Sequence, residues 1–242
     1  MKRSLVFLSL TLALSGCSIV AKTPMTRFES PEAIGEQWGV EAQLAYQGRN
    51  EVALTPNFAL KAPSLDNPSV ETPGHRVVAI GALGLFERFD INASLFDSRF
   101  GIKYQFLGSP FASAEKGNFS ASGYGGISSL KEEETQGTNY YYQLRELQYD
   151  LGLVFGLRVD HNVLLYSGPF MIWDKMKTDY RTTAAGVTVT QEASSRAYGF
   201  NLGIQFNKDK AFLRLEGAGM KTRLGNAYTG RGTYGGSVGT YF

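Results

Sequence analysis

The chain has 242 residues, of which 43% are hydrophobic and 19% charged, and its formal net charge is +2. This length suits one large all-β barrel or sandwich, and so small a charge gives no basis for nucleic-acid binding. Mean hydropathy is slightly negative, which argues against a bundle of membrane helices. It does not argue against a membrane β-barrel, because half of each strand in such a barrel is polar.

The N-terminus has the composition of an export signal. Lys2 and Arg3 form a basic region, and Leu5–Leu14 form an apolar run of about ten residues. A helix that spans a bilayer needs about 20 apolar residues. The run is therefore too short to span and fits a signal peptide.

The apolar run ends in Leu14-Ser15-Gly16-Cys17, which resembles the lipobox of bacterial lipoproteins. The resemblance implies a lipoprotein signal peptide at 1–16, cleavage before Cys17, and lipidation of its thiol and new amine. An ordinary signal peptide cleaved near the same place is the alternative. Cys17 is the only cysteine in the chain, so no internal disulfide can form. Ser18 occupies the position where Asp would resemble an inner-membrane retention signal, which fits sorting to the outer membrane.

Residues 17–35 contain Pro24 and Pro31 and are predicted to form a lipidated linker ahead of a barrel at 36–242. Within 36–242, ten segments have the composition of strands, most of them with apolar and polar residues in alternation. They are 37–47, 76–86, 89–95, 100–106, 119–129, 140–159, 163–174, 198–206, 211–216 and 233–242. The segments 76–86 and 163–174 are apolar on both faces, and Pro169 predicts a bulge or irregularity because it removes a ladder donor.

The clearest alternation lies at Leu147–Val159, where every odd position is apolar. The even positions are mostly polar or small and include Asp150, Gly152 and Arg158. Because a strand turns its side chains to alternate faces, this segment has one apolar face and one nearly polar face. Repeated around a closed sheet, it predicts an antiparallel transmembrane β-barrel that is apolar outside and polar inside.

The connections between strands give a second indication. Those at 48–75, 130–139, 175–194 and 220–231 are long, and those at 87–88, 160–162 and 207–210 are short. Long and short mostly alternate, as external loops and periplasmic turns do. The segment 175–194 fits either a loop or a strand extension. The connections at 97–98 and 108–117 break the pattern, so eight or twelve strands stay open beside ten.

The composition of the polar face decides which face points inward. It is rich in Gly, Asn and Gln, which suit a crowded polar lumen better than a water-facing surface. An aromatic girdle is predicted at strand ends, from Trp38 and Phe242 on the periplasmic side and Tyr140 and Tyr142 on the outer side. The opposite assignment, a lipid-tethered soluble barrel with its apolar face inside, is the alternative.

The terminal Thr240-Tyr241-Phe242 resembles the last strand of bacterial outer-membrane barrels, which commonly ends in an aromatic residue recognised by the assembly machinery. The resemblance implies a barrel in the outer membrane, anchored by the N-terminal lipid, with long loops outside the cell. It also implies outer-membrane lipid and the assembly machinery as partners.

Seven charged residues are expected in the lumen: Glu41, Asp90, Lys103, Asp150, Arg158, Arg214 and Glu216. Because buried charges are retained when they are paired, they predict an ion-pair network that fills a narrow barrel, with Arg158 or Arg214 as the partner of Asp150. The alternative is a narrow pore or a binding barrel for a small solute or lipid. In that case the two-faced apolar strands would supply an apolar wall.

Evidence for catalysis is weak. His75 and His161 are the only histidines. Ten-stranded omptin proteases place Asp and His at the external rim, whereas His161 is assigned to the opposite end, and no Ser–His pair like that of lipid A deacylases can be located. No cofactor or metal motif is present. The sequence therefore predicts a non-enzymatic protein with a structural or surface-interaction role and an unidentified surface partner.

Overall fold

A computed structural model describes residues 19–54, 56–57, 62–63, 70–96, 98–136, 140–182, 188–224 and 227–242. This part of the chain is almost entirely strand, with one short 3₁₀ helix, η1 (Phe111–Ser113). It contains no helix long and apolar enough to cross a membrane. The strands are β1 (Ile19–Pro24), β2 (Val40–Leu54), β3 (Pro56–Asn57), β4 (Ala62–Pro63), β5 (Val70–Phe86), β6 (Phe89–Ser94), β7 (Arg99–Leu107), β8 (Phe119–Gln136), β9 (Tyr140–Asp160), β10 (Val163–Thr182), β11 (Thr188–Lys208), β12 (Ala211–Leu224) and β13 (Ala227–Tyr241).

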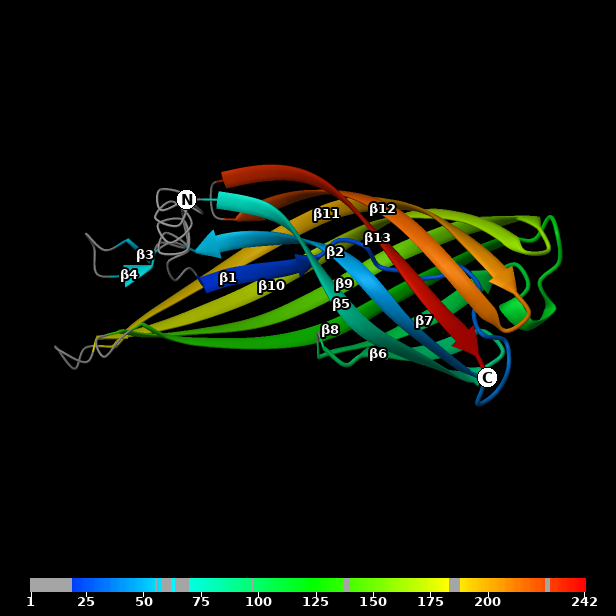
Figure 1. Cartoon of the computed structure of the whole chain (residues 1–242), viewed down its shortest axis with the longest axis horizontal. Helices are drawn as coiled ribbons and strands as arrows, with labels where there is room; N and C mark the ends of the chain where they lie inside the picture. Colours follow the sequence, from blue (N-terminus) through cyan, green and yellow to red (C-terminus); the bar gives the residue numbers. More distant parts are fainter. Residues whose placement is uncertain are drawn as a thin grey trace, which may run out of the picture.

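Within the described residues, ten antiparallel strands, β2 and β5 to β13, form a closed barrel (Figure 1). Strands β5 to β13 pair in chain order, and β2 closes the ring by pairing with both β13 and β5. This confirms the predicted ten-stranded antiparallel barrel. Strand β1 belongs to the same sheet through its pairing with β2, and β3 and β4 form a separate small bridge.

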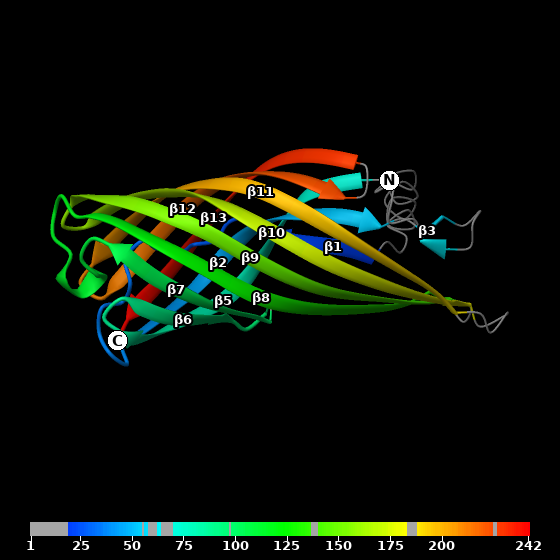
Figure 2. The ribbon, with the colours of Figure 1, turned by 180° about the vertical axis from the view of Figure 1, so that it is seen from behind.

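The two ends of the barrel differ. The turn side carries the tight β5–β6, β9–β10 and β11–β12 turns together with the C-terminus, and the loop side carries the β8–β9 and β10–β11 connections. On the loop side, strands β8 to β11 reach well beyond the low β6–β7 part of the wall (Figures 1 and 2). The loop predicted at 130–139 is therefore wrong over 130–136, where β8 continues, and 175–194 is a strand extension apart from its undescribed tip. Polar residues on both faces left no alternation to read there.

The turn-side connection at 108–118, which broke the predicted alternation of loop lengths, covers the mouth of the barrel. It contains η1, and the Phe111 ring stacks on the Tyr241 ring with centroids 4.0 Å apart. The Phe111 N–H donates to the Ala33 carbonyl at 2.8 Å. This connection is long because it packs against the mouth of the barrel instead of simply joining β7 to β8.

The two faces of the wall have opposite character. On β9, Leu151, Leu153 and Leu157 are 57%, 43% and 43% exposed on the outside, whereas Asp150 and Arg158 are buried inside. The same outward display of large apolar side chains recurs around the wall, for example at Leu44, Val77, Ile102, Phe200, Leu215 and Val238. A water-soluble protein would bury such a band, so the wall has the character of an outer-membrane barrel.

Glycines on the inner face leave room for aromatic side chains of the neighbouring strand. Phe170 lies opposite Gly199 and Tyr166 lies opposite Gly203. A Cβ atom added to Gly199 would stand 2.1 Å from the Phe170 ring, and one added to Gly203 would stand 2.2 Å from the Tyr166 ring. The glycine-rich inner face therefore makes room for lumen aromatics instead of widening a channel.

Pro169 interrupts the ladder as predicted. Gly168 and Pro169 on β10 have no paired residue on β9, although the register on either side of them is unchanged. The irregularity is therefore a local gap in pairing without a bulge, which follows from the missing N–H of proline.

Candidate functional site

The lumen of the barrel is occupied by the protein's own N-terminal residues. Residues 22–35, called here the lumen segment, are buried or half-buried throughout, and Met25 and Phe28 are each only 1% exposed. The segment begins with the last three residues of β1 and runs between the strands to the turn side (Figure 1). The sequence predicts a linker here, because these residues show neither strand nor helix periodicity. The structure instead places them inside the barrel, where side chains of the wall bind their backbone.

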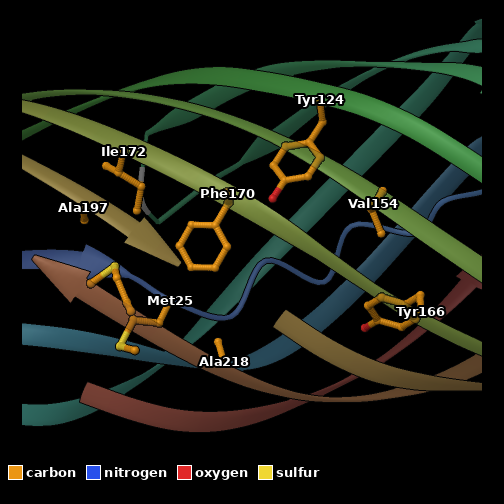
Figure 3. Close-up of a cluster of buried hydrophobic side chains, with 9 residues drawn as sticks. Met25, Tyr124, Val154, Tyr166, Phe170, Ile172, Ala197 and Ala218 are labelled. Atoms are coloured by element: carbon orange, nitrogen blue, oxygen red, sulfur yellow. The ribbon is translucent and has the colours of Figure 1, made fainter. Parts of the chain in front are cut away.

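An apolar belt surrounds the loop-side part of the lumen segment. Met25 packs in a buried cluster with Tyr124, Val154, Tyr166, Phe170, Ile172, Ala197, Ala218 and Met220 (Figure 3). Several of these residues come from β10, whose inner and outer faces are both apolar. The apolar wall that the sequence suggested for a small ligand is therefore already filled by Met25.

Glu216 on β12 holds the backbone of the segment. Its carboxylate accepts the N–H groups of Arg27 at 2.5 Å and Phe28 at 2.9 Å, and the Tyr166 hydroxyl at 3.0 Å. The Arg27 guanidinium lies over the Phe170 ring, 5.0 Å from its centroid. Glu216 was expected in the lumen, and its partners turn out to be the chain's own N-terminal residues.

Arg214 and Glu41 form a bidentate pair beside this site. The Nη1–Oε1 and Nη2–Oε2 distances are 2.8 Å and 3.0 Å, a geometry that favours strong, directional binding. Arg214 also donates to the Phe28 carbonyl at 2.9 Å and to Gln205 at 2.7 Å. This pair of predicted lumen residues therefore binds the lumen segment as well as each other.

The partner of Asp150 is Arg99, and neither Arg158 nor Arg214 pairs with it. Arg99 donates from Nε and Nη2 to the two carboxylate oxygens of Asp150 at 2.9 Å and 2.8 Å, and Arg27 lies 3.8 Å away. The predicted partners are wrong because both are used elsewhere. Arg99 lies at the start of β7, one residue before the predicted segment 100–106, and continues the polar face of Gly101 and Lys103.

Two predicted lumen charges on neighbouring strands pair with each other. Lys103 Nζ lies 3.0 Å from Asp90 and also donates to the Glu32 carbonyl at 3.1 Å. Asp90 in turn accepts the N–H of Ile34 at 3.2–3.3 Å. The Ala33 N–H donates to the side-chain oxygen of Gln105 at 2.7 Å. Strands β6 and β7 are thus both linked to the lumen segment near the turn side.

Arg158 pairs with Glu32 of the lumen segment. Its Nε donates to Glu32 Oε1 at 3.1 Å, its Nη2 makes a short contact with the second oxygen, and Asn118 donates to the same carboxylate at 3.1 Å. Both members of the pair are almost fully buried. Sequence reasoning missed Glu32, Arg27 and Arg99. For Arg99 the available signal was the polar face of Gly101 and Lys103, which it continues; the predicted set itself was near balance, with four acids and three bases.

The predicted girdle residues lie at two ends of the wall. Trp38 and Phe242 are 65% and 66% exposed, and Phe242 exchanges backbone hydrogen bonds with Val40 at the turn side. Tyr140 and Tyr142 belong to the loop-side part of β9, and their side chains lie outside the described part of the structure. Cys17, the predicted lipid site, also lies outside the described residues.

The histidines do not form part of a catalytic group in the described residues. His75 stacks on Tyr46 with centroids 4.8 Å apart, and the carbonyl of His161 accepts a hydrogen bond from Arg158 at 2.8 Å. Among the residues the structure describes, no cluster of three His, Cys, Asp or Glu side chains could hold a metal ion. What the lumen can do chemically is to bind an extended peptide through both its backbone and its charges.

Residues 1–18 match the family of prokaryotic membrane lipoprotein lipid attachment sites. Among solved structures, Ail of Yersinia pestis is similar over 86% of this chain and 100% of its own, with 16% identity and a TM-score of 0.39. Neisserial surface protein A is similar over 85% and 97%, with 10% identity and a TM-score of 0.33. The outer-membrane protease OmpT of Escherichia coli is similar over 92% and 93%, with 8% identity and a TM-score of 0.32. No curated protein matches the sequence. The chain thus combines a lipoprotein attachment sequence with a closed ten-stranded barrel of outer-membrane type.

Proposed function

We propose that the protein is an outer-membrane lipoprotein with a filled, non-conducting barrel, and that it acts as a structural or surface-interaction protein without catalysis. The observation that carries this proposal is the lumen segment. Its backbone and charged side chains are bound by Glu216 and Arg214 on β12, Asp90 on β6 and Arg158 on β9, which are three different strands. A lumen used for transport would instead leave a continuous path for solute.

The space that remains beside the segment is small. The cavity lined by Arg27, Phe28, Glu41, Asp90 and Lys103 has a volume of about 30 Å³. This is about the volume that one water molecule takes up in the liquid. Side chains also fill small barrels of this size, so the narrow-pore alternative has little support in the described part of the lumen.

Conductance in planar bilayers tests the filled barrel. The complete protein is expected to show no single-channel steps. The control is a variant in which residues 22–35 are replaced by a Gly/Ser sequence of equal length, which should leak ions because the lumen loses its apolar and ionic contacts. Steady conductance steps from the unaltered protein would contradict the proposal and favour the pore.

The proposed orientation places the loop side outside the cell. Lys131, Arg145 and Lys177 lie opposite one another on β8, β9 and β10, and all three are exposed on the outer face. Lys131 and Lys177 also pair with Glu133 and Glu192, and cations at the edge of an apolar band favour contact with anionic lipid headgroups. The row lies just beyond the apolar band, which supports outer-membrane lipid as a partner on this side.

Epitope insertion tests the orientation. An epitope after Gly137, between β8 and β9, should bind antibody on intact cells, and one after His161 should bind only after permeabilisation. The position after Gly137 is preferable to any position within 131–136, because β8 continues through those residues. The reverse pattern of accessibility would invert the barrel.

The proposed interaction surface is the loop-side extension of β8 to β11, which projects beyond the apolar band. Recognition of the C-terminal strand by the assembly machinery is part of the same proposal, supported by the exposed terminal Phe242. A pull-down of the protein with and without its last residue, from cells that express the assembly machinery, tests that part. Equal recovery of the machinery with both forms would count against it.

A further inference from the structure

The direction in which the lumen segment runs is set by strand pairing. β1 is antiparallel to β2, with Ile19 opposite Leu54 and Pro24 opposite Arg49. β2 begins at the turn side, where Val40 bonds to Phe242, and ends at the loop side with Leu54. Ile19 therefore lies at the loop side, and the chain descends from there.

Contacts along the segment follow the same direction. Near its start, Lys22 pairs with Glu132 on the loop-side part of β8. Midway, Arg27 and Phe28 bind Glu216. Three residues past its end, the Trp38 N–H donates to the Gly84 carbonyl at 2.7 Å, beside the tight β5–β6 turn. The order of these contacts, from loop side to turn side, shows a single passage through the barrel without a reversal.

The position of Ile19 limits where the lipid can lie. Cys17 is two residues before Ile19 in the sequence, and a chain spans at most about 3.6 Å per residue, so the covalent reach from Ile19 to the cysteine is at most about 7 Å. The 15 residues of β2 rise by roughly 3.3 Å each, and the strands of such barrels tilt by about 45°. The turn side is therefore on the order of 30 Å away along the barrel axis, beyond the reach of Cys17.

We propose that the N-terminal lipid is anchored on the loop side of the membrane, because the lumen segment carries the N-terminus through the barrel. With the loop side outside the cell, as proposed above, the acyl chains lie in the outer leaflet of the outer membrane. A linker that left the barrel at the turn side would instead place the lipid in the periplasmic leaflet. The inference rests on the proposed orientation for the identity of the leaflet, and on the described contacts alone for the passage through the lumen.

The first test uses epitopes in the full-length, lipidated protein. An epitope after Ser18 should bind antibody on intact cells, whereas one after Glu36, at the turn side, should bind only after permeabilisation. Epitopes after Gly137 and His161 report the orientation independently. If Gly137 reads as external but the epitope after Ser18 is protected, the passage through the lumen is overturned. If Gly137 itself is protected, the proposed orientation fails instead.

The second test asks whether the lumen segment lies inside the barrel, and it needs no insertion. A Cβ atom at Gly156 would stand 2.5 Å from the Pro31 ring, so Pro31→Cys with Gly156→Cys should form a disulfide. The matched control is Pro31→Cys with Leu157→Cys, because Leu157 faces outward and should not cross-link through the wall. Mobility on a non-reducing gel distinguishes the two. Absence of the 31–156 disulfide in folded protein, or equal cross-linking of both pairs, would overturn the proposal.

Discussion

Arg158 on β9 and Glu32 in the lumen segment form a buried ion pair that joins the N-terminus to the barrel wall. The two residues are 126 positions apart in the sequence, and Asn118 binds the same carboxylate. A buried charge that loses its partner remains uncompensated, which usually costs more than the pair itself contributes. The stability of the barrel should therefore respond strongly to changes in a segment that forms no part of its wall.

Glu32→Ala should lower the free energy of unfolding by about 3–5 kcal/mol, because it leaves the Arg158 guanidinium buried without its carboxylate. Urea unfolding in lipid vesicles measures this. Arg158→Leu in the Glu32→Ala background should recover part of the loss. A cost under about 1 kcal/mol, which is typical of exposed pairs, would show that the segment does not occupy the lumen.

Asp150→Ala should cost a similar amount, about 3–5 kcal/mol, because Arg99 loses both of its hydrogen bonds to the Asp150 carboxylate and keeps only the longer carboxylate contact, with Glu29 at 3.5 Å. A second change, Arg99→Ala, should recover part of the loss in the same unfolding assay. Arg158→Ala in the Asp150→Ala background serves as the control. It should lower the free energy of unfolding further, since Arg158 belongs to a different pair. Rescue by Arg158→Ala instead of Arg99→Ala would contradict the observed pairing.

Leu153→Arg should destabilise the barrel by about 2–4 kcal/mol in vesicles, because it places a charge on the lipid-facing surface near the middle of the membrane. Leu153→Ala should change stability much less. In a soluble tethered barrel Leu153 would be a core residue, and Leu153→Ala would cost about 2–5 kcal/mol through a cavity. The ratio of the two effects therefore separates the two types of barrel.

Gly199→Val should cost about 1–3 kcal/mol, the usual range for overpacking, because its Cβ overlaps the Phe170 ring. Replacing that ring, in Gly199→Val with Phe170→Leu, should restore part of the stability, as a double-mutant cycle measures. The matched control is Gly219→Val, since a Cβ atom at Gly219 meets nothing within 4 Å. Equal effects at the two glycines would mean that the loss comes from the strand backbone and not from Phe170.

Cys17→Ala should abolish incorporation of labelled palmitate and leave the barrel in the membrane fraction, since the apolar wall holds it there independently. Labelling of whole cells followed by fractionation at high pH measures both. Unlabelled wild-type protein would contradict lipidation at Cys17. Release of the folded Cys17→Ala protein into the soluble fraction would contradict a wall embedded in lipid.

The barrel wall was predictable because one physical rule acts along it. Lipid on one side and a polar lumen on the other impose a period of two, and β9 shows this in Leu151, Leu153 and Leu157 against Asp150 and Arg158. Beyond the apolar band, water lies on both sides and the rule no longer applies. The ends of β8 and β10 were therefore predicted too short, although the ladder continues through them.

The contents of the lumen were not predictable in the same way. Beyond Pro24, where β1 ends, residues 25–35 form no periodic structure, so nothing in their sequence distinguishes a peptide bound in a channel from a linker in water. Most of the charged residues in the lumen were predicted from the alternation within their strands. Three of their partners, Arg27, Glu32 and Arg99, lie outside the segments predicted to alternate. Which charged side chains pair across a barrel depends on how the sheet closes in three dimensions. The spacing of residues along one strand does not encode this.

The pairing of β2 constrains the order in which the protein assembles. β13 binds β2 only over Glu41–Tyr46, and farther along, β1 occupies the same edge of β2. The acyl chains proposed at Cys17 are too bulky to be pulled through a ring that has already closed. We therefore expect the N-terminal residues to lie along β2 before β13 joins it. The finished molecule is then a ring of strands closed around its own chain, with the proposed lipid at one end of that chain and the first wall strand at the other.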